Sequence, residues 1–594
     1  MMRRPAALLP ILLLALLLPA LGGCDILYGF AQDIGLIPKD DSGDHGTASC
    51  NTAGVLSSDP LTEFQWHLQN TGQTAFADVA GTSGQDICAV PVYNDGYSGS
   101  GVVIAVVDSG LEIAHEDLSG NVVAGLSHNF LTGGTDPTNT SATSGDHGTS
   151  VGGLSAATWG NGVGGQGVAP QAGLVGYNLL ANFSDANQVL SLGGASYSAG
   201  VEVFNQSYGF SNNSPITINT TVRAQLVDGI TNKREGKGAI YVKSAGNGFI
   251  GFGTADCTYA KQAGLSCQNT NMDPQNAEPY NITVAALDAG GVRSSYSTAG
   301  AGVWISAPGG EYGYNSNYVS YSNPVAGEPA MVTTDQSGCS KGYSPNYNFN
   351  ALQSGHPDNA NCDYTSTFNG TSSAAPVLSG VVALMLEANP NLTWRDVKHI
   401  LASTARQVDA SIAAVTLPFT TGTYTARDAW ITNAAGYKFH NWYGFGAVNA
   451  QAAVSAALNY SANSWAAQTT KSADSGLITL TIPDSNATGI TGTLLISSGF
   501  TFTEAVQIKV WSDHTNIGEL GLELSSPNTK SILLTVNNGF EGANSLGSGM
   551  VLLSNAFYGE NPTGTWTLRA IDSSDDTGHG SGNITQWTIT VYGH

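Results

Sequence analysis

Residues 101–110 read Gly-Val-Val-Ile-Ala-Val-Val-Asp-Ser-Gly, a continuous apolar run that ends in an aspartate. Such a run is typical of a parallel strand that is buried on both faces. Farther along, Val377–Ala388 has the spacing of an apolar helix, and Pro390 closes it. Strand-like runs alternate with helical patterns over residues 59–458, which predicts an α/β domain with a parallel sheet.

The last part of the chain, residues 477–594, has a different pattern. Short strand-like runs, among them Val506–Trp511 and Trp587–Val591, are separated by turn residues such as Ser526-Pro527-Asn528. This pattern predicts an antiparallel β-sandwich. The polar residues 459–476, which lie between the two patterns, are predicted to be a linker.

Length and charge exclude some classes of protein. The chain has 594 residues, more than one hydrophobic core usually supports, so we expect more than one domain. Its 44 acidic and 20 basic residues give a net charge of −24. Phosphate recognition needs clustered Lys and Arg, so we expect no nucleic-acid partner.

The N-terminus predicts export. A basic start, residues 1–4, precedes the apolar residues 5–21, which is the pattern of a secretory signal; a single membrane span is the alternative. Leu21-Gly22-Gly23-Cys24 resembles the bacterial lipobox, in which the cysteine becomes lipidated. We therefore expect a signal peptide over residues 1–23, a lipid anchor at Cys24 and a tether over residues 24–58. The predicted location is the bacterial cell envelope, facing the periplasm or the cell surface.

The cysteine count also fits an exported protein. There are seven cysteines, and assigning Cys24 to a lipid leaves an even set, which indicates disulfides. The sequence does not select one connectivity. The hypothesis adopted is sequential pairing: Cys50 with Cys88, Cys257 with Cys267, and Cys339 with Cys362.

Three short segments carry chemically useful side chains. Asp108 ends the first apolar run, His147 lies among small residues, and Ser372 opens the long apolar helix, with Pro376 expected in its first turn. Taken singly, they have ordinary explanations, such as a turn Asp, a surface His and a helix-capping Ser. Taken together, the order Asp…His…Ser on one α/β domain resembles the catalytic triad of the subtilase family of serine proteases.

The resemblance implies a role for each residue. Ser372 would be the nucleophile, His147 the general base and then acid, and Asp108 the group that holds the imidazole tautomer. In Ser244-Ala245-Gly246-Asn247-Gly248, which resembles the oxyanion-hole segment of the family, Asn247 would donate its side-chain amide to the oxyanion together with the Ser372 N–H.

The resemblance also implies where the substrate binds. Residues 205–209 resemble the strand that pairs with an extended substrate backbone and forms one wall of the pocket for the residue before the scissile bond. The implied substrate-binding residues are Ser207, Tyr208, Gly209, Ser244, Ala245 and Gly246.

Within the family, the closest pattern is that of the kexin-type enzymes. Asp59–Leu68, Leu386–Val397 and Tyr443–Ala450 resemble parts of their catalytic domain, and Gly564–Leu568 fits the P (homo B) domain that follows it. The resemblance covers residues 59–594. It implies a catalytic domain over residues 59–458 and a P domain over residues 477–594, and we expect a monomer.

Kexin-type enzymes cleave after paired basic residues, but this sequence departs from them at three positions. Ser109, Asn212 and Thr298 stand where those enzymes carry acidic residues. A basic substrate side chain needs carboxylates to offset the loss of its solvation. The sequence leaves open whether Asp256, Asp273 or Glu278 replaces them. We therefore expect a serine endopeptidase of broad or non-dibasic specificity that acts on protein and peptide substrates, with strict dibasic processing as the alternative.

The resemblance also implies a structural Ca²⁺ held by oxygen ligands, and a Gly-rich loop without metal is the alternative. The implied calcium ligands are Asp59, Asp117, Thr158, Asn161, Val163 and Gly165.

The alternative function of another class is that of a surface-binding protein. In such a protein the protease domain would be inactive and the P domain would carry the function.

Overall fold

The computed structural model describes residues 54, 56–140, 147–210, 213–344, 348–497, 499–540, 546–574 and 582–594. The predicted signal peptide, nearly all of the predicted tether, Cys24, Cys50 and Asn212 lie outside the described residues.

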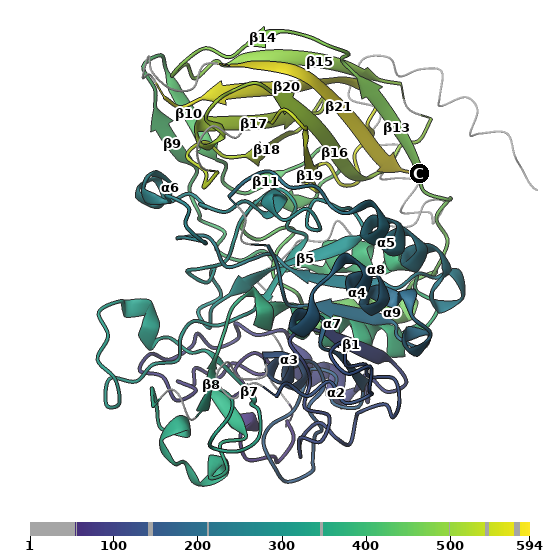
Figure 1. Ribbon diagram of the computed structural model, residues 1–594, viewed down its shortest axis with the longest axis vertical. Coiled ribbons are helices and arrows are strands. Elements are labelled where there is room, and N and C mark those ends of the chain that lie inside the picture. Colours follow the sequence, from purple (N-terminus) through teal and green to yellow (C-terminus); the bar gives the residue numbers. More distant parts are fainter. Residues whose placement is uncertain are drawn as a thin grey trace, which may run out of the picture. The chain divides into compact units, whose positions relative to one another are not determined.

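A parallel sheet forms the centre of the first part of the chain. Its six strands lie in the order β2-β1-β3-β4-β5-β6, and every neighbouring pair is parallel. Figure 1 labels two of them, β1 and β5. The predicted α/β fold is therefore confirmed. The strands are β1 (Val103–Val107), β2 (Gly173–Tyr177), β3 (Val203–Gln206), β4 (Ile240–Ser244), β5 (Asn281–Leu287) and β6 (Ile305–Pro308).

The order of the strands determines where a site can form. Strand β1 pairs with β2 on one side and β3 on the other, so the chain changes direction across the sheet next to β1. In open parallel sheets, ligands bind beyond the carboxyl ends of the strands at such a point. The residues that follow β1 and β3 are Asp108 and Ser207, and both belong to the predicted site.

Helix α7 (Thr371–Ala388) packs on β1 and β3–β6 and is flanked by α3 (His147–Ala156) and α9 (Ala450–Asn459). Its first residues are buried as well as its apolar ones, because its N-terminus points into the site. Within the described residues, α7 is the one helix that is long and apolar enough to cross a membrane, and 89% of that stretch is buried in the fold. The other α-helices of the described part of the chain are α2 (Ala89–Asn94), α4 (Asp185–Val189), α5 (Thr220–Asn232), α6 (Thr258–Ala263) and α8 (Trp394–Thr404).

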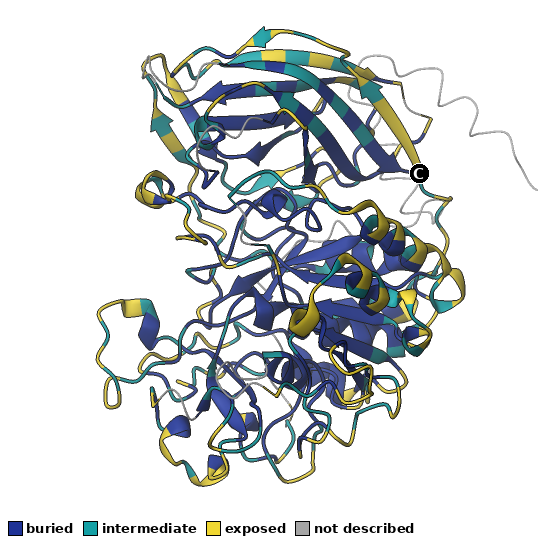
Figure 2. Ribbon diagram, in the orientation of Figure 1, coloured by how far each residue is buried: buried dark blue, intermediate teal, exposed yellow. Residues whose placement is uncertain are grey.

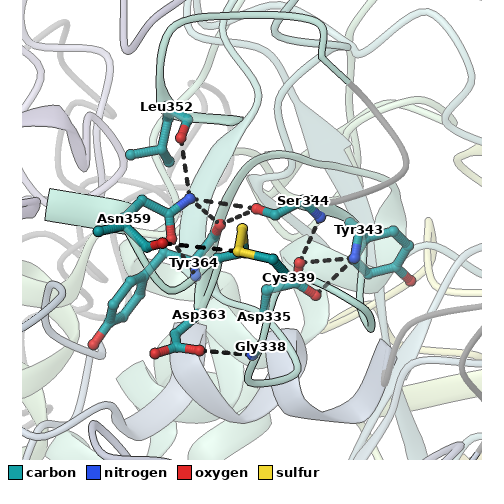
Figure 3. Close-up of a disulfide and its surroundings, with 11 residues drawn as sticks. Asp335, Gly338, Cys339, Tyr343, Ser344, Leu352, Asn359, Asp363 and Tyr364 are labelled. Carbon is teal, nitrogen blue, oxygen red and sulfur yellow. Dashed lines mark hydrogen bonds between the residues drawn. A yellow bond between two sulfur atoms is a disulfide. The ribbon is translucent and has the colours of Figure 1, made fainter. Parts of the chain in front are cut away.

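An antiparallel pair, β7 (Met331–Thr334) and β8 (Tyr364–Phe368), lies just before α7 in the chain. The loop between the two strands is closed by the Cys339–Cys362 disulfide (Figure 3). Asp335 accepts hydrogen bonds from the Tyr343 and Ser344 N–H groups, and Asn359 Nδ2 donates to Tyr364 O at 2.9 Å. These bonds hold the loop against β8, which leads directly into the helix that carries Ser372.

The disulfides agree with sequential pairing where the structure describes them. Cys257 is bonded to Cys267, and Cys339 is bonded to Cys362, which confirms both predicted pairs. Cys88 is also disulfide-bonded. Its predicted partner, Cys50, lies outside the described residues.

The second part of the chain is a β-sandwich, as predicted. One antiparallel sheet has the order β13-β21-β16-β19 with β14 beside β21, and the other has the order β15-β20-β17-β18. Their facing side chains share one apolar core, which includes Val510, Leu522, Trp566 and Trp587. The strands are β13 (Thr469–Asp474), β14 (Leu480–Thr481), β15 (Ile490–Ile496), β16 (Thr503–Ser512), β17 (Leu520–Ser525), β18 (Lys530–Leu534), β19 (Met550–Ser554), β20 (Gly564–Asp572) and β21 (Asn583–Gly593).

One expectation needs correction. Residues 469–474, which we assigned to the linker, form β13 and pair with β21. Thr-Thr-Lys-Ser-Ala-Asp shows no apolar alternation because β13 is an edge strand whose side chains are almost all exposed (Figure 2). A strand without a buried face gives no periodic signal in the sequence.

The apolar core of the sandwich continues into the first part of the chain. Residues of the Phe252–Met272 region, Ala301 and the hairpin of β9 (Val415–Pro418) and β10 (Thr423–Arg427) belong to the same buried cluster as the sandwich strands. A second, two-stranded ribbon, β11 (Ile431–Thr432) with β12 (Lys438–Phe439), follows this hairpin. The sandwich is therefore packed on the α/β part through a shared core.

Candidate active site

Strand β1 delivers Asp108 to the carboxyl edge of the sheet. The Asp108 N–H donates to Tyr177 O at 3.0 Å, which extends the pairing with β2. The Asp108 side chain is fully buried, and its Oδ1 lies 2.8 Å from His147 Nδ1. The Ser109 N–H donates to the same oxygen at 2.6 Å. The structure thus joins two of the three predicted catalytic residues by a hydrogen bond.

His147 is the first residue of α3, and this position depends on the glycine that follows it. A Cβ atom on Gly148 would collide with Gly110 O and would lie 3.0 Å from the Asp108 Cβ. Only glycine therefore allows the start of α3 to approach the turn that carries Asp108. The imidazole also contacts the edge of the Phe368 ring, with 5.2 Å between the ring centroids. Phe368 is the last residue of β8, so His147 lies close to the segment that leads to Ser372.

Ser372 is the second residue of α7, at the helix N-terminus. Its Oγ donates to Ser207 O at 3.2 Å, and Ser207 Oγ donates to Ser372 O at 2.9 Å. Pro376 lies within the helix rather than in its first turn as expected, because α7 begins at Thr371. Proline has no N–H to donate to the carbonyl four residues earlier, which is Ser372 O, and Ser207 supplies the missing donor.

The Asn247 side chain is fixed beside the start of α7. Its Oδ1 accepts hydrogen bonds from the Thr371 N–H at 2.8 Å and from Thr371 Oγ1 at 2.9 Å. A Cβ atom on Gly370, whose φ is 100°, would lie 3.1 Å from Asn247 Nδ2 and 3.4 Å from Ser372 N. Two N–H donors therefore border one small space that a glycine leaves open.

The two predicted substrate-binding segments lie side by side at the ends of neighbouring strands. Ser207–Gly209 follow β3, and Ser244–Gly246 end and follow β4. Ser244 Oγ lies 3.2 Å from Tyr208 O, and the Gly246 N–H donates to Thr371 Oγ1 at 3.0 Å. The second contact connects this segment to the residue before Ser372.

The sequence reading missed one residue in this region. Lys243, the residue before Ser244, is fully buried and forms an ion pair with Asp273 at 3.0 Å. Its Nζ also donates to Tyr208 O. A lysine directly after the apolar run Ala239–Val242 is the signal that could have revealed it, because buried lysines are rare unless paired.

None of the three carboxylates considered as substitutes for the missing acidic residues is buried without a partner. Asp256 is exposed and accepts from the Thr258 N–H. Glu278 is buried and paired with the Arg223 guanidinium; burial raises its pKa to about 7, and Arg223 opposes that rise. Asp273 is paired with Lys243.

The predicted calcium ligands form one hydrogen-bonded cluster. Asp59 accepts from the Gly160 and Gly162 N–H groups, at 2.5 and 2.8 Å. Asp117 accepts from Asn161 Nδ2 at 2.9 Å and from the Gly165 N–H at 3.3 Å. The Thr158 N–H donates to Asp117 O at 2.8 Å, and the Val163 N–H donates to Asn161 Oδ1 at 3.1 Å.

The chemistry of this cluster fits a hard divalent cation. Burial, with the charges of Asp59 and Glu116, raises the pKa of Asp117 to about 8. A cation would offset the desolvation and repulsion of these carboxylates. A Cβ atom on Gly164 would overlap Asp117 Oδ2, so the loop closes tightly over the carboxylate. Carboxylate, amide and carbonyl oxygens are the ligands that Ca²⁺ prefers.

The comparisons with known proteins agree with this geometry. Residues 99–446 match the subtilase family, and residues 503–591 match the proprotein convertase P-domain. The extracellular serine protease of Aeromonas sobria is 36% identical over 94% of this chain and 94% of its own length. A crystal structure of the A. sobria serine protease in complex with a chaperone superposes with a TM-score of 0.83, at 34% identity, over 94% of this chain and 98% of that chain.

Mouse furin is 25% identical over 90% of this chain and 58% of its own length. Three findings agree: the two family matches, the likeness to a bacterial protease over nearly the whole chain, and the packing of the sandwich on the α/β part. The chain therefore belongs to the subtilase family of serine proteases and carries a P domain of the proprotein-convertase type.

Proposed function

We propose that the protein is a serine endopeptidase that uses Ser372, His147 and Asp108 as its catalytic triad. The observation that carries this proposal is the 2.8 Å hydrogen bond between His147 Nδ1 and the buried Asp108, beside the helix N-terminus that carries Ser372. When Nδ1–H donates to Asp108, Nε2 carries the lone pair of the imidazole and can accept a proton.

In the proposed reaction, the Ser372 hydroxyl turns from Ser207 O toward the imidazole and attacks the substrate carbonyl carbon while His147 takes its proton. The oxyanion receives hydrogen bonds from Asn247 Nδ2 and the Ser372 N–H, which border the same space beside Gly370. His147 then protonates the leaving amine, and the C–N bond breaks. Water hydrolyses the acyl-enzyme by the same steps, with His147 again acting first as base and then as acid.

We propose broad, non-dibasic specificity for the same site. Ser109 replaces one of the expected acidic residues, and its hydroxyl accepts from the Gly148 N–H at 3.2 Å. Thr298 replaces another and donates to Gln268 Oε1 at 3.0 Å. Of the candidate substitutes, Asp256 is exposed, and Glu278 and Asp273 are each paired with a cation of this chain. Strict dibasic cleavage would need free carboxylates beside the substrate.

The test combines labelling with product analysis. A fluorophosphonate should label the purified protein at Ser372, and the Ser372→Ala variant should remain unlabelled. The protein should cut an unstructured protein mixture after varied residues in the presence of Ca²⁺, and Ser372→Ala should make no cuts. Cuts confined to sites after paired Lys or Arg would overturn the specificity, and an unlabelled wild-type protein would overturn the enzymatic proposal.

We also propose a structural Ca²⁺ at Asp59, Asp117, Thr158, Asn161, Val163 and Gly165, and a lipid anchor at Cys24 that holds the enzyme to the bacterial envelope. The hydrogen-bonded cluster supports the first proposal, and the Leu21–Cys24 motif supports the second. Detergent-phase partitioning of the full chain tests the anchor: the wild type should enter the detergent phase, and Cys24→Ser should stay in the aqueous phase.

A further inference from the structure

A buried lysine connects the two substrate-binding segments. Lys243 is the fourth residue of β4, and its Nζ donates to Tyr208 O and pairs with Asp273 Oδ2 at 3.0 Å. The Lys243 side chain is 0% exposed and that of Asp273 is 5% exposed. The ammonium also lies 5.0 Å from the centre of the Tyr208 ring. One internal cation is thus bonded to the segment after β3 and belongs to the strand that leads into Ser244–Gly246.

The ion pair lies directly against the segment that would receive substrate. A Cβ atom on Gly209 would lie 3.1 Å from Asp273 Oδ2 and 3.6 Å from Lys243 Nζ. The Phe210 N–H donates to the same Asp273 oxygen at 3.3 Å. Asp273 is therefore a carboxylate in contact with this segment, and its Oδ2 atom, which accepts from the Phe210 N–H, also pairs with the ammonium of Lys243.

Stability alone does not account for the pair. Removing two charges from water costs several kcal/mol per ion, and a buried pair often contributes no more than apolar residues of the same size. The neighbours of Lys243 in β4, Tyr241 and Val242, are buried and apolar, so the strand itself does not require a charge at position 243. The lysine has a specific effect instead: it neutralises the Asp273 carboxylate, which contacts the substrate-binding segment at Gly209 and Phe210.

We propose that Lys243 is a specificity determinant that occupies Asp273 and so excludes basic side chains from the pocket for the substrate residue before the scissile bond. A substrate Lys or Arg entering beside Gly209 would meet a positive charge and would find no free carboxylate, so its desolvation would be uncompensated. Uncharged side chains meet no such barrier. This inference rests on the proposed protease function and adds the group that sets its preference.

The wild-type enzyme provides the first test. Peptides that differ only in the residue before the scissile bond should be cleaved with kcat/KM at least 10-fold lower for Arg and Lys than for Leu or Phe. Benzamidine, a small aromatic cation, should not inhibit the wild type competitively. Equal or faster cleavage after Arg and Lys would overturn the inference, and this result does not depend on whether any variant folds.

Variants provide the second test. Lys243→Met should free Asp273, raise kcat/KM for the Arg peptide at least 10-fold relative to the Leu peptide, and make the enzyme sensitive to benzamidine. Lys243→Met/Asp273→Asn, which removes both charges, should return to the wild-type preference. Lys398→Met is the matched control, because Lys398, on α8, is also buried but donates to Pro279 O. The peptide preference of this variant should not change.

Active-site titration with a fluorophosphonate separates the possible failures. All rates are divided by the concentration of titrated sites, so partial misfolding of a variant does not alter the preference. A Lys243→Met enzyme that titrates normally and keeps the wild-type preference would contradict the inference while leaving the protease function intact. A wild-type protein that neither titrates nor cleaves any peptide would instead contradict the proposed function itself.

Discussion

At the scale of single residues, Pro376 and Ser207 show how the nucleophile is held. A proline within the first turns of α7 leaves Ser372 O without its helical donor, and Ser207 Oγ donates to it at 2.9 Å. The residue that carries the nucleophile is thereby bonded to the segment that would bind substrate. A buried carbonyl without a partner would cost about 1–3 kcal/mol. The presence of Pro376 in α7 therefore depends on the hydrogen bond that Ser207 donates to Ser372 O.

Asn247 supports a prediction about catalysis at this scale. Asn247→Asp keeps the oxygen that accepts from Thr371 but removes the Nδ2 donor beside Gly370. We expect kcat to fall about 10²–10³-fold, since one oxyanion donor is lost, with KM nearly unchanged. Steady-state kinetics on a peptide substrate measures this. The melting temperature should stay within a few degrees of the wild type, and a kcat within threefold of wild type would contradict the assigned role.

His67 supports a prediction about pH. It is fully buried, both ring nitrogens lack a partner, and burial lowers its pKa to about 3 from 6.5. Between these pH values the unfolded state binds more protons than the folded state, so the free energy of unfolding falls as the pH falls, by about 1.4 kcal/mol per unit. Urea unfolding at pH 7.5 and pH 5 should show a smaller loss for His67→Leu than for the wild type.

The pKa of His440 is also lowered to about 3, mainly by burial. Because His440 is unchanged in His67→Leu, that variant should still lose part of its free energy of unfolding between pH 7.5 and pH 5. Equal losses in His67→Leu and the wild type would show that His67 does not titrate in this way.

At the scale of elements, one segment connects the site to the sandwich. Residues 267–276 carry Asp273 beneath the substrate-binding segment, and Asn276 Nδ2 donates to Ser244 O at 3.3 Å. Earlier in the same segment, Asn271 Nδ2 donates to Leu553 O at 3.1 Å and its Oδ1 accepts from the Leu553 N–H at 2.8 Å. The wall of the proposed substrate pocket is therefore held in place partly by β19.

The elements also show what the sequence could predict. The runs that became β1 and α7 were readable because long apolar stretches form where an element is buried on all sides. The exposed edge strand β13 gave no signal, and Pro376 was wrongly expected in the first turn of α7. The flanking motifs of Asp108, His147 and Ser372 made these residues the candidates for the site. The Lys243–Asp273 pair was not, because it joins residues that are distant in sequence and lack a shared motif.

The Gly-rich loop after α3 supports a prediction about the effect of calcium removal on stability. The cluster of Asp59, Asp117 and Asn161 ties the chain before Trp66 to the Gly-rich loop after α3. A ligand at 100 times its Kd adds about 2.7 kcal/mol to the free energy of unfolding, so EDTA should lower the melting temperature, and Ca²⁺ but not Mg²⁺ should restore it. Asp117→Asn should melt at a temperature that no longer responds to either treatment, and a wild type indifferent to EDTA would disprove the site.

At the scale of the whole molecule, the two parts share an apolar core and a buried ionic network. The apolar cluster that fills the sandwich includes Leu522 and Trp566 from the sandwich strands. It also includes Phe252 and Tyr424, which precede the sandwich in the chain. Beside it, Arg395 on α8 forms two hydrogen bonds with Glu504 on β16, at 2.8 and 2.5 Å, and His594 Nδ1 lies 2.9 Å from the same carboxylate. Burial raises the pKa of Glu504, but the hydrogen bonds and charge of these partners outweigh burial. The pKa of Glu504 therefore lies below its usual value.

This network predicts how unfolding of the two parts is coupled. Arg395→Met would leave the buried Glu504 carboxylate with only His594 and the neutral amide of Gln468 as partners. Breaking a buried pair in this way costs about 3–5 kcal/mol. Arg395→Met/Glu504→Gln removes both charges and should recover most of that loss. Because the core is shared, tryptophan fluorescence and fluorophosphonate reactivity should be lost in one transition in every variant. Separate transitions, or equal losses in the single and double variants, would show that the sandwich does not support the active site through this interface.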